Sequence, residues 1–415
     1  MKKLKTVILI ILIFSNIFIT NNIYGDDFLE ENNIEYNILE DVAAEPTKVP
    51  KLNSRSAIIY DRNSKVILYG KEENTKRAMA STTKIMTAIV VLEKANLSDV
   101  VEVSSKAAGT GGSRLGLKRG DKITVHNLLY GLMLCSGNDA AVALAEYVGG
   151  DISKFADLMN QKAKELDLNN TSFKTPHGLD APDHYTTAYE LAKLADYALN
   201  IPEFLKIVGT KNYTININGN SKNLNNTNEL LGNLNGVYGV KTGFTNGANR
   251  CLVTSTKRGD MDIICVVLGA DTKKDRTQDS AKLIEYAFSN YQIIDLKKIV
   301  KDEFEKWKNN NFINVIKGSK EVIKYGFDDS KIGQYPVLKD EFKDIEVQIS
   351  ILKEVEAPVD LNKVVGEIRI LIKDKEILKT EIVTIEMINK KGIYDYFKNF
   401  ISDYNCYIQE AIKAE

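Results

Sequence analysis

A serine followed three residues later by a lysine, in Ser81-Thr82-Thr83-Lys84, is the pair in this sequence with the clearest chemical potential. A serine hydroxyl is a weak nucleophile until a neighbouring base takes its proton. Side chains at i and i+3 share one face of a helix, so the Lys84 amine can reach the Ser81 hydroxyl. The apolar run at residues 85–92 predicts a buried helix opening at this point, whose first N–H groups suit a developing oxyanion. We therefore interpret Ser81 as a nucleophile and Lys84 as its base.

This spacing alone is weak evidence, because a chain of this length contains about two such matches by chance. A second match is Ser350 with Lys353. It lies in an alternating segment typical of a strand, where residues i and i+3 point to opposite faces. Lys353 is therefore not a suitable base for Ser350, and the argument for Ser81 depends on residues further along the chain.

Two more motifs follow in order, Ser136-Gly137-Asn138 and Lys241-Thr242-Gly243. The first lies at a turn between two predicted helices, and the second lies on a short predicted strand before a hairpin. A lysine base must be neutral to accept a proton, and we expect burial and the charge of Lys241 to lower the pKa of Lys84.

The same motifs supply the remaining parts of an acyl-transfer site. Ser136 can relay a proton to a leaving amine. Asn138 can orient Lys84 and hold a substrate amide. The backbone N–H groups of Ser81 and Phe244 can form an oxyanion hole. The residues together predict nucleophilic catalysis that needs no histidine base.

Composition excludes several other classes of protein. The chain has 415 residues, 44% hydrophobic and 27% charged, with a net charge of −1. Such a length suggests two or three domains, and the absence of a basic excess argues against a nucleic-acid partner. Three histidines and four cysteines without ligand spacing predict no metal, and we expect no cofactor. Cys251 and Cys265 are expected on neighbouring strands; whether they pair stays open, and buried free thiols are favoured.

The N-terminal sequence is typical of a signal peptide for export. Lys2, Lys3 and Lys5 precede an apolar stretch at residues 7–20, and Gly25 offers a small residue for cleavage. We expect residues 1–25 to be a signal peptide and residues 26–51, which are acidic and rich in Asn, to be a linker. The mature protein is thus expected outside the cytoplasm.

The elements that must position the motifs form an α/β unit. Strand-like runs at residues 57–60 and 66–69 predict a hairpin, residues 100–200 are mostly helical, and strands return after residue 211. Because the first hairpin must join the later strands, we expect an antiparallel sheet with a helical subdomain over residues 52–292. Residues 293–388 alternate and predict a small all-β domain.

The tail at residues 389–415 predicts an amphipathic helix. Its apolar residues at helical spacing are Ile393, Tyr396, Phe397, Phe400, Ile401, Tyr404, Ile408 and Ile412. It can pack on the β-rich domain or lie in the surface of a membrane. We favour an anchor on the outer face of the plasma membrane, although its polar face is not strongly basic.

The three motifs together resemble those of the penicillin-recognising serine enzymes. Residues 80–86, 136–140, 177–180 (His177-Gly178-Leu179-Asp180) and 241–245 are more specifically similar to the D-alanyl-D-alanine carboxypeptidases among them. The resemblance covers nearly the whole chain, from the signal peptide to the amphipathic tail. It implies the same fold class: a catalytic α/β domain, a β-rich domain and a C-terminal helix.

The resemblance also implies an activity and partners. A D-alanyl-D-alanine carboxypeptidase removes the terminal D-Ala of a peptidoglycan pentapeptide through an acyl-enzyme, here on Ser81, and β-lactam antibiotics acylate the same serine. The substrate-binding residues implied are Thr242, Gly243, Phe244, Thr245 and Arg276, with Thr242, Thr245 and Arg276 on the substrate carboxylate. His177 is implied to order its loop. Some relatives carry a histidine at the position of Phe244, so one polar side chain is missing here.

Two other functions stay open. A class A β-lactamase shares the three motifs and needs a deacylating glutamate, for which Glu165 with Asn169 is a formal match. A non-catalytic cell-wall-binding protein is the other. Fast turnover of benzylpenicillin would favour the first, and release of D-Ala by a Ser81→Ala protein would exclude our mechanism.

Overall fold

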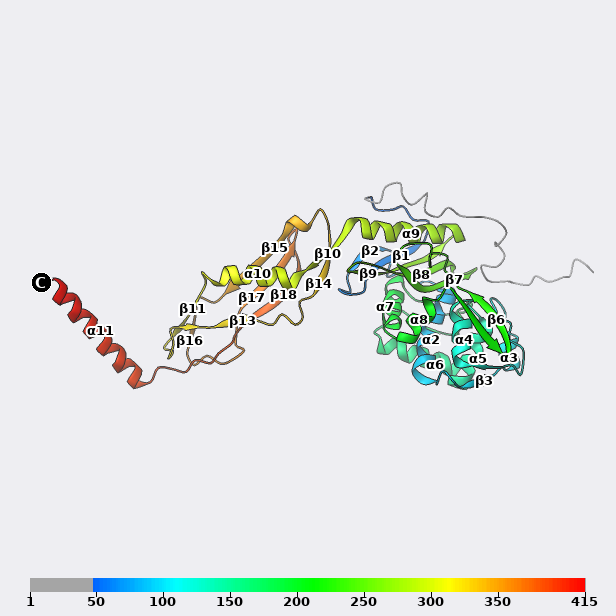
Figure 1. The fold of residues 1–415 in the computed structure, drawn as a ribbon, viewed down its shortest axis with the longest axis horizontal. Coiled ribbons are helices and arrows are strands. Elements are labelled where there is room, and N and C mark those ends of the chain that lie inside the picture. The colour runs from blue at the N-terminus through cyan, green and yellow to red at the C-terminus, as the bar shows by residue number, and fades with distance from the viewer. Residues whose placement is uncertain (1–47, 415) are drawn as a thin grey trace, which may run out of the picture. The chain divides into compact units, whose positions relative to one another are not determined.

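The computed structural model describes residues 48–414. The chain forms two compact units that divide between Asn290 and Tyr291 (Figure 1). The predicted signal peptide, and the predicted linker up to residue 47, lie outside the described residues. Each unit is described by itself below.

The first unit is organised around a five-stranded antiparallel sheet. Its strands are β1 (Ser56–Asp61), β2 (Ile67–Lys71), β7 (Val237–Thr245), β8 (Asn249–Arg258) and β9 (Met261–Ala270). Their order is β2-β1-β9-β8-β7, so the first strand of the unit pairs with the last. Every residue of β9 is buried, as expected for a central strand covered on both faces. The predicted antiparallel α/β fold is confirmed.

Helices cover both faces of this sheet (Figure 1). On one face, α9 (Lys273–Asn290) packs against β8 and β9. On the other lies a helical layer around α2 (Lys84–Lys94), whose first eight residues are all buried. The other helices of the layer are α3 (Ser105–Ala108), α4 (Val125–Met133), α5 (Asn138–Gly149), α6 (Ile152–Glu165), α7 (Ala188–Leu199) and α8 (Pro202–Val208). The unit also contains two small antiparallel pairs of strands. In one, β3 (Val100–Glu102) pairs with β4 (Lys122–Thr124); the other is the hairpin of β5 (Asn212–Ile217) and β6 (Asn220–Asn225).

The helix expected to open at Ser81 begins slightly later. Residues Ala80–Thr83 form a short 3₁₀ turn, and α2 starts at Lys84. A 3₁₀ turn places residues i and i+3 above one another, so the Ser81 and Lys84 side chains still share a face.

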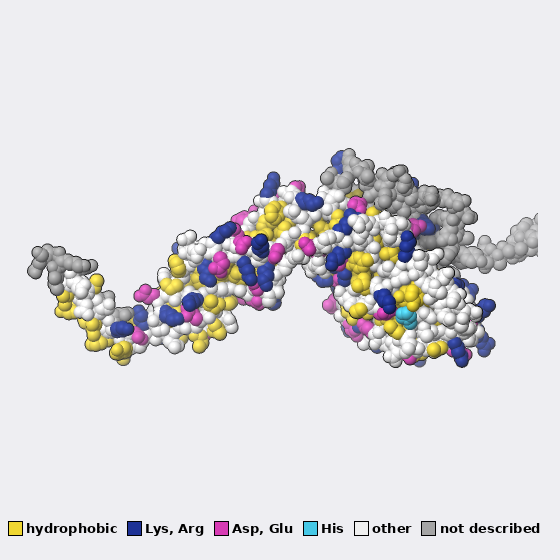
Figure 2. Space-filling model, in the orientation of Figure 1, with side chains coloured by type: hydrophobic (Ala, Val, Ile, Leu, Met, Phe, Trp, Pro, Cys, Tyr) yellow, Lys and Arg dark blue, Asp and Glu magenta, His cyan; other side chains and the backbone are white. Residues whose placement is uncertain are grey.

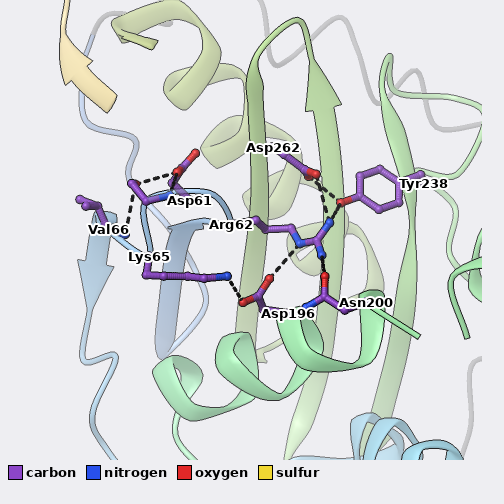
Figure 3. A network of polar contacts seen from close by, with 9 residues as sticks. Asp61, Arg62, Lys65, Val66, Asp196, Asn200, Tyr238 and Asp262 are labelled. Carbon is purple, nitrogen blue, oxygen red and sulfur yellow. Dashed lines mark hydrogen bonds and ion pairs between the residues drawn. The ribbon is translucent and has the colours of Figure 1, made fainter. Parts of the chain in front are cut away.

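A network of polar side chains lies at the end of the sheet where β7 and β9 begin (Figure 3). Arg62 lies at its centre, with Nε 3.0 Å from an Asp196 oxygen and Nη1 3.1 Å from an Asp262 oxygen. The hydroxyl of Tyr238 accepts from Arg62 at 2.9 Å and donates to Asp262 at 2.5 Å. The network therefore ties the β1–β2 turn to α7, β7 and β9.

The second unit is rich in β-strands. One sheet has the order β13-β18-β17-β15, made of β13 (Tyr325–Phe327), β15 (Ile345–Ile351), β17 (Val364–Ile372) and β18 (Lys375–Thr384). Two smaller sheets contain β10 (Tyr291–Asp295) with β14 (Gln334–Leu338), and β11 (Ile313–Ile316) with β12 (Val322–Ile323) and β16 (Glu354–Glu356). Ser350 lies in β15, as expected for the chance match.

The expectation of a purely β domain is wrong in one respect. Helix α10 (Leu296–Lys308) follows β10 and buries Leu296, Val300 and Phe304. These residues recur every four positions, which is a helical spacing. The many charged residues between these three make the apolar stripe hard to recognise in the sequence. The strands that follow show a clear alternation of apolar and polar residues.

The last element of the described residues is α11 (Ile393–Ala414). Figure 2 shows hydrophobic side chains along this helix. Ile393 is 91% exposed, Phe397 62% and Phe400 67%. Each helix described over residues 48–414 is either too short or too polar to span a lipid bilayer.

Cys251 and Cys265 lie on β8 and β9, but the register pairs Cys265 with Thr254. Both thiols are free and buried, as favoured from the sequence.

Candidate active site

The Lys84 ammonium lies at the centre of the candidate site. Its Nζ is 2.7 Å from Ser81 Oγ, 2.7 Å from Asn138 Oδ1 and 2.8 Å from the His177 carbonyl oxygen. Lys84 is completely buried and Ser81 is 6% exposed. A neutral amine has two N–H donors and one lone pair. It can therefore keep two of these contacts while its lone pair accepts the proton of Ser81.

Close backbone contacts hold the Ser81 turn from two sides. A Cβ on Gly243 would lie 2.9 Å from the Ser81 nitrogen, and a Cβ on Gly178 would lie 1.9 Å from the Ala80 carbonyl oxygen. Neither distance is possible for a real side chain, so only glycine allows β7 and the 177–180 loop to approach this turn. The turn itself has Ala80 at φ 48°. The nucleophile is thus fixed by backbone packing.

The turn between α4 and α5 brings Ser136 and Asn138 to the site. Asn138 donates from Nδ2 to the Gly111 carbonyl at 2.8 Å while its Oδ1 accepts from Lys84. Ser136 has φ 61°, is 2% exposed, and its hydroxyl makes no hydrogen bond within residues 48–414. A buried hydroxyl without a partner is costly, and a substrate group would relieve that cost.

Asp139, the residue after the Ser136–Asn138 motif, shapes the same turn. Its carboxylate accepts from the backbone N–H groups of Leu115, Gly116 and Leu117 at 2.7 to 3.0 Å. Asp139 is fully buried. It holds the loop that precedes α4 against the Asn138 turn, a role that the sequence did not indicate.

The motif Lys241-Thr242-Gly243 lies on β7, beside the Ser81 turn. Lys241 is 1% exposed and donates to the Thr242 carbonyl at 3.0 Å. Lys84 contacts both Ser81 and Asn138, and a Cβ on Gly243 would lie 2.9 Å from the Ser81 nitrogen. The three motifs therefore meet in one place, and alternation puts Lys241, Gly243 and Thr245 on the same face of β7.

Thr242 and Thr245 are both held by hydrogen bonds to neighbouring segments, and the Thr245 hydroxyl also accepts from the Ala248 N–H at 3.0 Å. The Thr242 hydroxyl lies 2.7 Å from the Thr227 hydroxyl. Thr245 donates to Asp180 at 2.6 Å, and the second Asp180 oxygen accepts from the Gly247 N–H at 3.0 Å. The 177–180 loop therefore positions both the Ser81 turn and the end of β7.

Arg276 and Phe244 have partners that the sequence did not indicate. Arg276 is fully buried in the first turn of α9, with Nη2 3.6 Å from Glu229 Oε2. The segment containing Thr227 and Glu229 thus contacts both Thr242 and Arg276.

The Arg250 guanidinium stacks over the Phe244 ring at 3.8 Å, a cation–π contact between paired residues of β7 and β8.

His177 contributes its backbone to the site and its ring to its own loop. The carbonyl accepts from Lys84, and Nδ1 accepts from the Leu179 N–H at 3.2 Å. Burial and the charge of Lys84 lower the pKa of His177 to about 3, so the ring is neutral at neutral pH.

His184 was not singled out from the sequence, yet it supports the nucleophile turn. Its Nδ1 accepts from the Lys174 N–H at 2.9 Å, which leaves the proton on Nε2. Nε2 is 2.8 Å from the Thr83 hydroxyl, and that hydroxyl donates to the Ala80 carbonyl at 2.8 Å. Burial lowers the pKa of His184 to about 4, which keeps the ring in this neutral form.

Glu165, the formal match to a deacylating glutamate, ends α6 with an exposed side chain. It forms an ion pair with Lys162 at 2.7 Å, and Lys162 also contacts Glu93 on α2. None of these residues belongs to the Ser81 site, so the match carries no β-lactamase function.

Comparison with known proteins places this site in a family. A family model described as D-alanyl-D-alanine carboxypeptidase matches residues 43–272. The chain is 35% identical to the D-alanyl-D-alanine carboxypeptidase DacF of Bacillus subtilis, over 85% of this chain and 90% of that protein. It is 34% identical to the D-alanyl-D-alanine carboxypeptidase DacC of Escherichia coli, over 86% of this chain and 90% of that protein.

Solved structures agree with the sequence comparisons. Penicillin binding protein 5 from Haemophilus influenzae superposes with a TM-score of 0.66 at 27% identity, covering 83% of this chain and 99% of that one. The similarity therefore includes the second unit as well as the catalytic unit.

Proposed function

Because this chain belongs to the D-alanyl-D-alanine carboxypeptidase family, we propose that Ser81 is the residue acylated when it removes the terminal D-Ala of a peptidoglycan stem peptide. The protein is a serine-type D-alanyl-D-alanine carboxypeptidase, a penicillin-binding enzyme of the cell wall. The observation that carries the assignment of Ser81 is the buried Lys84 amine 2.7 Å from its hydroxyl.

In the proposed mechanism, neutral Lys84 takes the proton of Ser81 as Oγ attacks the carbonyl of the penultimate D-Ala. The backbone N–H groups of Ser81 and Phe244 stabilise the oxyanion. The C–N bond breaks, D-Ala leaves with a proton relayed through Ser136, and water then hydrolyses the ester. Asn138 keeps Lys84 oriented throughout, since its Oδ1 accepts from Nζ.

We assign recognition of the substrate carboxylate to Thr242, Thr245 and Arg276. The Thr242 hydroxyl, paired with that of Thr227, can donate to the carboxylate, and Thr245 would do so by turning its hydroxyl from Asp180. The buried Arg276, 3.6 Å from Glu229, supplies positive charge. Lys241 adds a second buried positive charge, which favours neutrality of Lys84 and attracts an anionic substrate. The same groups would bind the carboxylate of a β-lactam.

The experiment is incubation with diacetyl-Lys-D-Ala-D-Ala, measuring released D-Ala with and without benzylpenicillin. The wild-type protein should release D-Ala, and penicillin should stop the release by forming a long-lived adduct on Ser81. A Ser81→Ala protein that still released D-Ala would exclude the mechanism. Lys84→Ala should slow acylation by at least about 100-fold, since general-base catalysis contributes that much.

We also propose where the enzyme works. The sequence of residues 1–25 supports export, with the catalytic unit of residues 52–292 held outside the cell. The β-rich unit, residues 293–388, would separate it from the membrane. Helix α11, within residues 389–415, supports attachment to the outer face of the membrane by its exposed apolar side chains.

A further inference from the structure

A group of exposed apolar side chains lies at the end of the β-rich unit from which the chain enters α11 (Figure 2). Met387 is 68% exposed, Ile385 52% and Leu361 51%. We call the whole group the apolar end; its members are Ile316, Val322, Leu361, Val364, Ile385 and Met387. Scattered apolar residues are normal on a protein surface, whereas a contiguous group marks a surface that contacts a partner or a membrane.

Backbone pairing brings the members of the apolar end together. Residues 359–364 run antiparallel to residues 383–388, and Val359 and Ile388 exchange hydrogen bonds of 2.9 and 3.0 Å. This pairing places Leu361 and Val364 beside Ile385 and Met387. The Ile385 N–H also donates to the Lys324 carbonyl at 3.1 Å, directly after β12, which contains Val322. The group is therefore one surface.

The backbone also ties this surface to the start of α11. The Ser319 N–H donates to the Asn389 carbonyl at 2.8 Å, and the Lys391 N–H donates to the Lys317 carbonyl at 2.8 Å. Helix α11 begins at Ile393, two residues after Lys391. Two residues of chain span at most about 7 Å. A helix in a membrane surface lies about 5–10 Å deep, so a membrane that holds the start of α11 is within reach of the apolar end.

Lysines border the apolar end. Lys324 and Lys363 are exposed, and their backbones bond to residues 384 and 385. Nearby carboxylates take up part of the positive charge, since Lys320 pairs with Glu386 and Lys317 with Glu356. The remaining lysines suit the phosphates of lipid headgroups. Because this charge is modest, apolar contact is the main attraction that the surface offers.

We propose that the apolar end enters the headgroup region of a phospholipid membrane together with the start of α11, so that the β-rich unit touches the membrane directly. This rests on the proposed attachment through α11 and deepens it. The six side chains are too few to hold the protein without the helix, so they add a second point of contact. Two contacts restrict how the β-rich unit tilts against the membrane.

The first test places a tryptophan in the apolar end and measures whether lipid reaches it. The chain has one tryptophan, Trp307, so the variant Trp307→Phe/Met387→Trp carries a single fluorophore. The vesicles contain equal parts of dioleoylphosphatidylglycerol and a phosphatidylcholine brominated on its acyl chains. We expect the variant to float with these vesicles and its fluorescence to fall by about half relative to vesicles without bromine.

The matched control is Trp307→Phe/Phe342→Trp. Phe342 is 49% exposed and precedes β15, whose first residue Ile345 pairs with Ile372 at the far end of β17. The nine residues of β17 separate this position from Val364 by about 26 Å. The control should float equally well and keep its fluorescence in brominated vesicles.

A second test keeps Trp307 and therefore does not depend on the first. Ile385→Ser/Met387→Ser should bind the same vesicles about tenfold more weakly, because two half-exposed apolar side chains no longer leave water. Phe342→Ser should bind like the wild type. Both variants should release D-Ala from diacetyl-Lys-D-Ala-D-Ala at the wild-type rate.

Three results would overturn the proposal. The first is unquenched fluorescence of the Met387→Trp variant on vesicles with which it floats. The second is emission from this variant that is already blue-shifted without vesicles, which would mean that α11 or a second copy covers the apolar end; sedimentation separates these two. The third is unchanged vesicle binding by Ile385→Ser/Met387→Ser. A wild-type protein that does not float overturns the attachment through α11 as well, whereas failure of the proposed peptidase activity appears only as absent D-Ala release.

Discussion

At the scale of single residues, the site depends on short contacts around one lysine. Lys84 has acceptors from three separate parts of the chain: Ser81, Asn138 and the His177 carbonyl. In the neutral amine, Asn138 and the His177 carbonyl accept the two N–H groups, which leaves the lone pair for the Ser81 hydroxyl. Such preorganisation is worth a large part of the rate enhancement of an enzyme.

Replacing Gly243 by Ala should disable the site without unfolding the protein. The new Cβ would lie 2.9 Å from the Ser81 nitrogen and 3.1 Å from the Thr82 nitrogen, so β7 or the nucleophile turn must shift. A displacement of about 1 Å near the chemistry can cost about 100-fold in rate. We therefore expect acylation by fluorescent penicillin to slow by about that factor.

Gly333→Ala is the matched control, since no atom lies within 4 Å of the added Cβ. It should acylate at the wild-type rate. Normal acylation in Gly243→Ala would show that the close approach of β7 to Ser81 is not required.

Because His184 is buried and neutral, the free energy of unfolding should depend on pH. The pKa of His184 is about 4 in the folded protein against 6.5 for the free side chain, so the unfolded state binds more protons between these values. The contribution of the neutral ring is full above pH 6.5 and is lost as the pH falls toward 4. A shift of this size corresponds to about 3 kcal/mol.

His184→Gln removes this titration and keeps one acceptor and one donor. We expect the unfolding free energy of the wild type, relative to the variant, to fall by about 3 kcal/mol between pH 7 and pH 4. Chemical denaturation at several pH values measures it. A difference that does not change with pH would contradict the assignment of a buried, neutral His184.

At the scale of elements, the sheet and the helical layer are joined at one end by the active site and at the other by the network around Arg62 (Figure 3). Arg62 contacts carboxylates on α7 and β9, and both side chains are only 11% exposed. Without Arg62, Asp196 would keep its ion pair with Lys65, whereas Asp262 would stay buried without the Arg62 charge, which is costly.

Arg62→Met should therefore destabilise the catalytic unit by about 3 kcal/mol. Lys154→Gln, which removes an exposed ion pair with Asp151, should cost less than about 1 kcal/mol. Urea denaturation compares the two. Equal stability of both variants would mean that the network does not hold the end of the sheet.

At the scale of the whole molecule, α11 offers a surface of exposed apolar side chains. Tyr396, Phe397 and Phe400 are each more than half exposed, an arrangement typical of a helix that lies in a membrane surface. The neighbouring residue Lys391 is still held by the second unit, since its N–H donates to the Lys317 carbonyl. Removal of the chain after Gly392 should therefore leave that unit intact.

We expect the protein without residues 393–415 to lose binding to phospholipid vesicles in a flotation assay and to keep its release of D-Ala. Phe397→Asp with Phe400→Asp should weaken binding in the same way, because a charged side chain on the apolar face opposes insertion. Lys398→Gln changes a neighbouring exposed residue and serves as the control. Equal flotation of the truncated and full-length proteins would exclude α11 as the anchor.

The sequence by itself determined the family, the fold class of the catalytic unit and the residues that we propose for the chemistry. Ser81, Ser136 and Lys241 could be recognised because each motif occurs in a particular context of helix, turn or strand, and such contexts follow from local periodicity. The family and the antiparallel sheet followed from the same patterns, whereas the pairing of Cys251 and Cys265 stayed open, with free thiols favoured. Helix α10 was missed because lysine and glutamate obscured a stripe of only three buried residues.

Only the tertiary structure decided which side chains hold these motifs together. The links from His184 through Thr83, from Asp139 to residues 115–117, and from Asp180 to Thr245 join parts of the chain far apart in sequence. The pairing of Arg276 with Glu229 is of the same kind. No local pattern encodes such contacts, because they depend on distances that exist only once the sheet and the helical layer have packed.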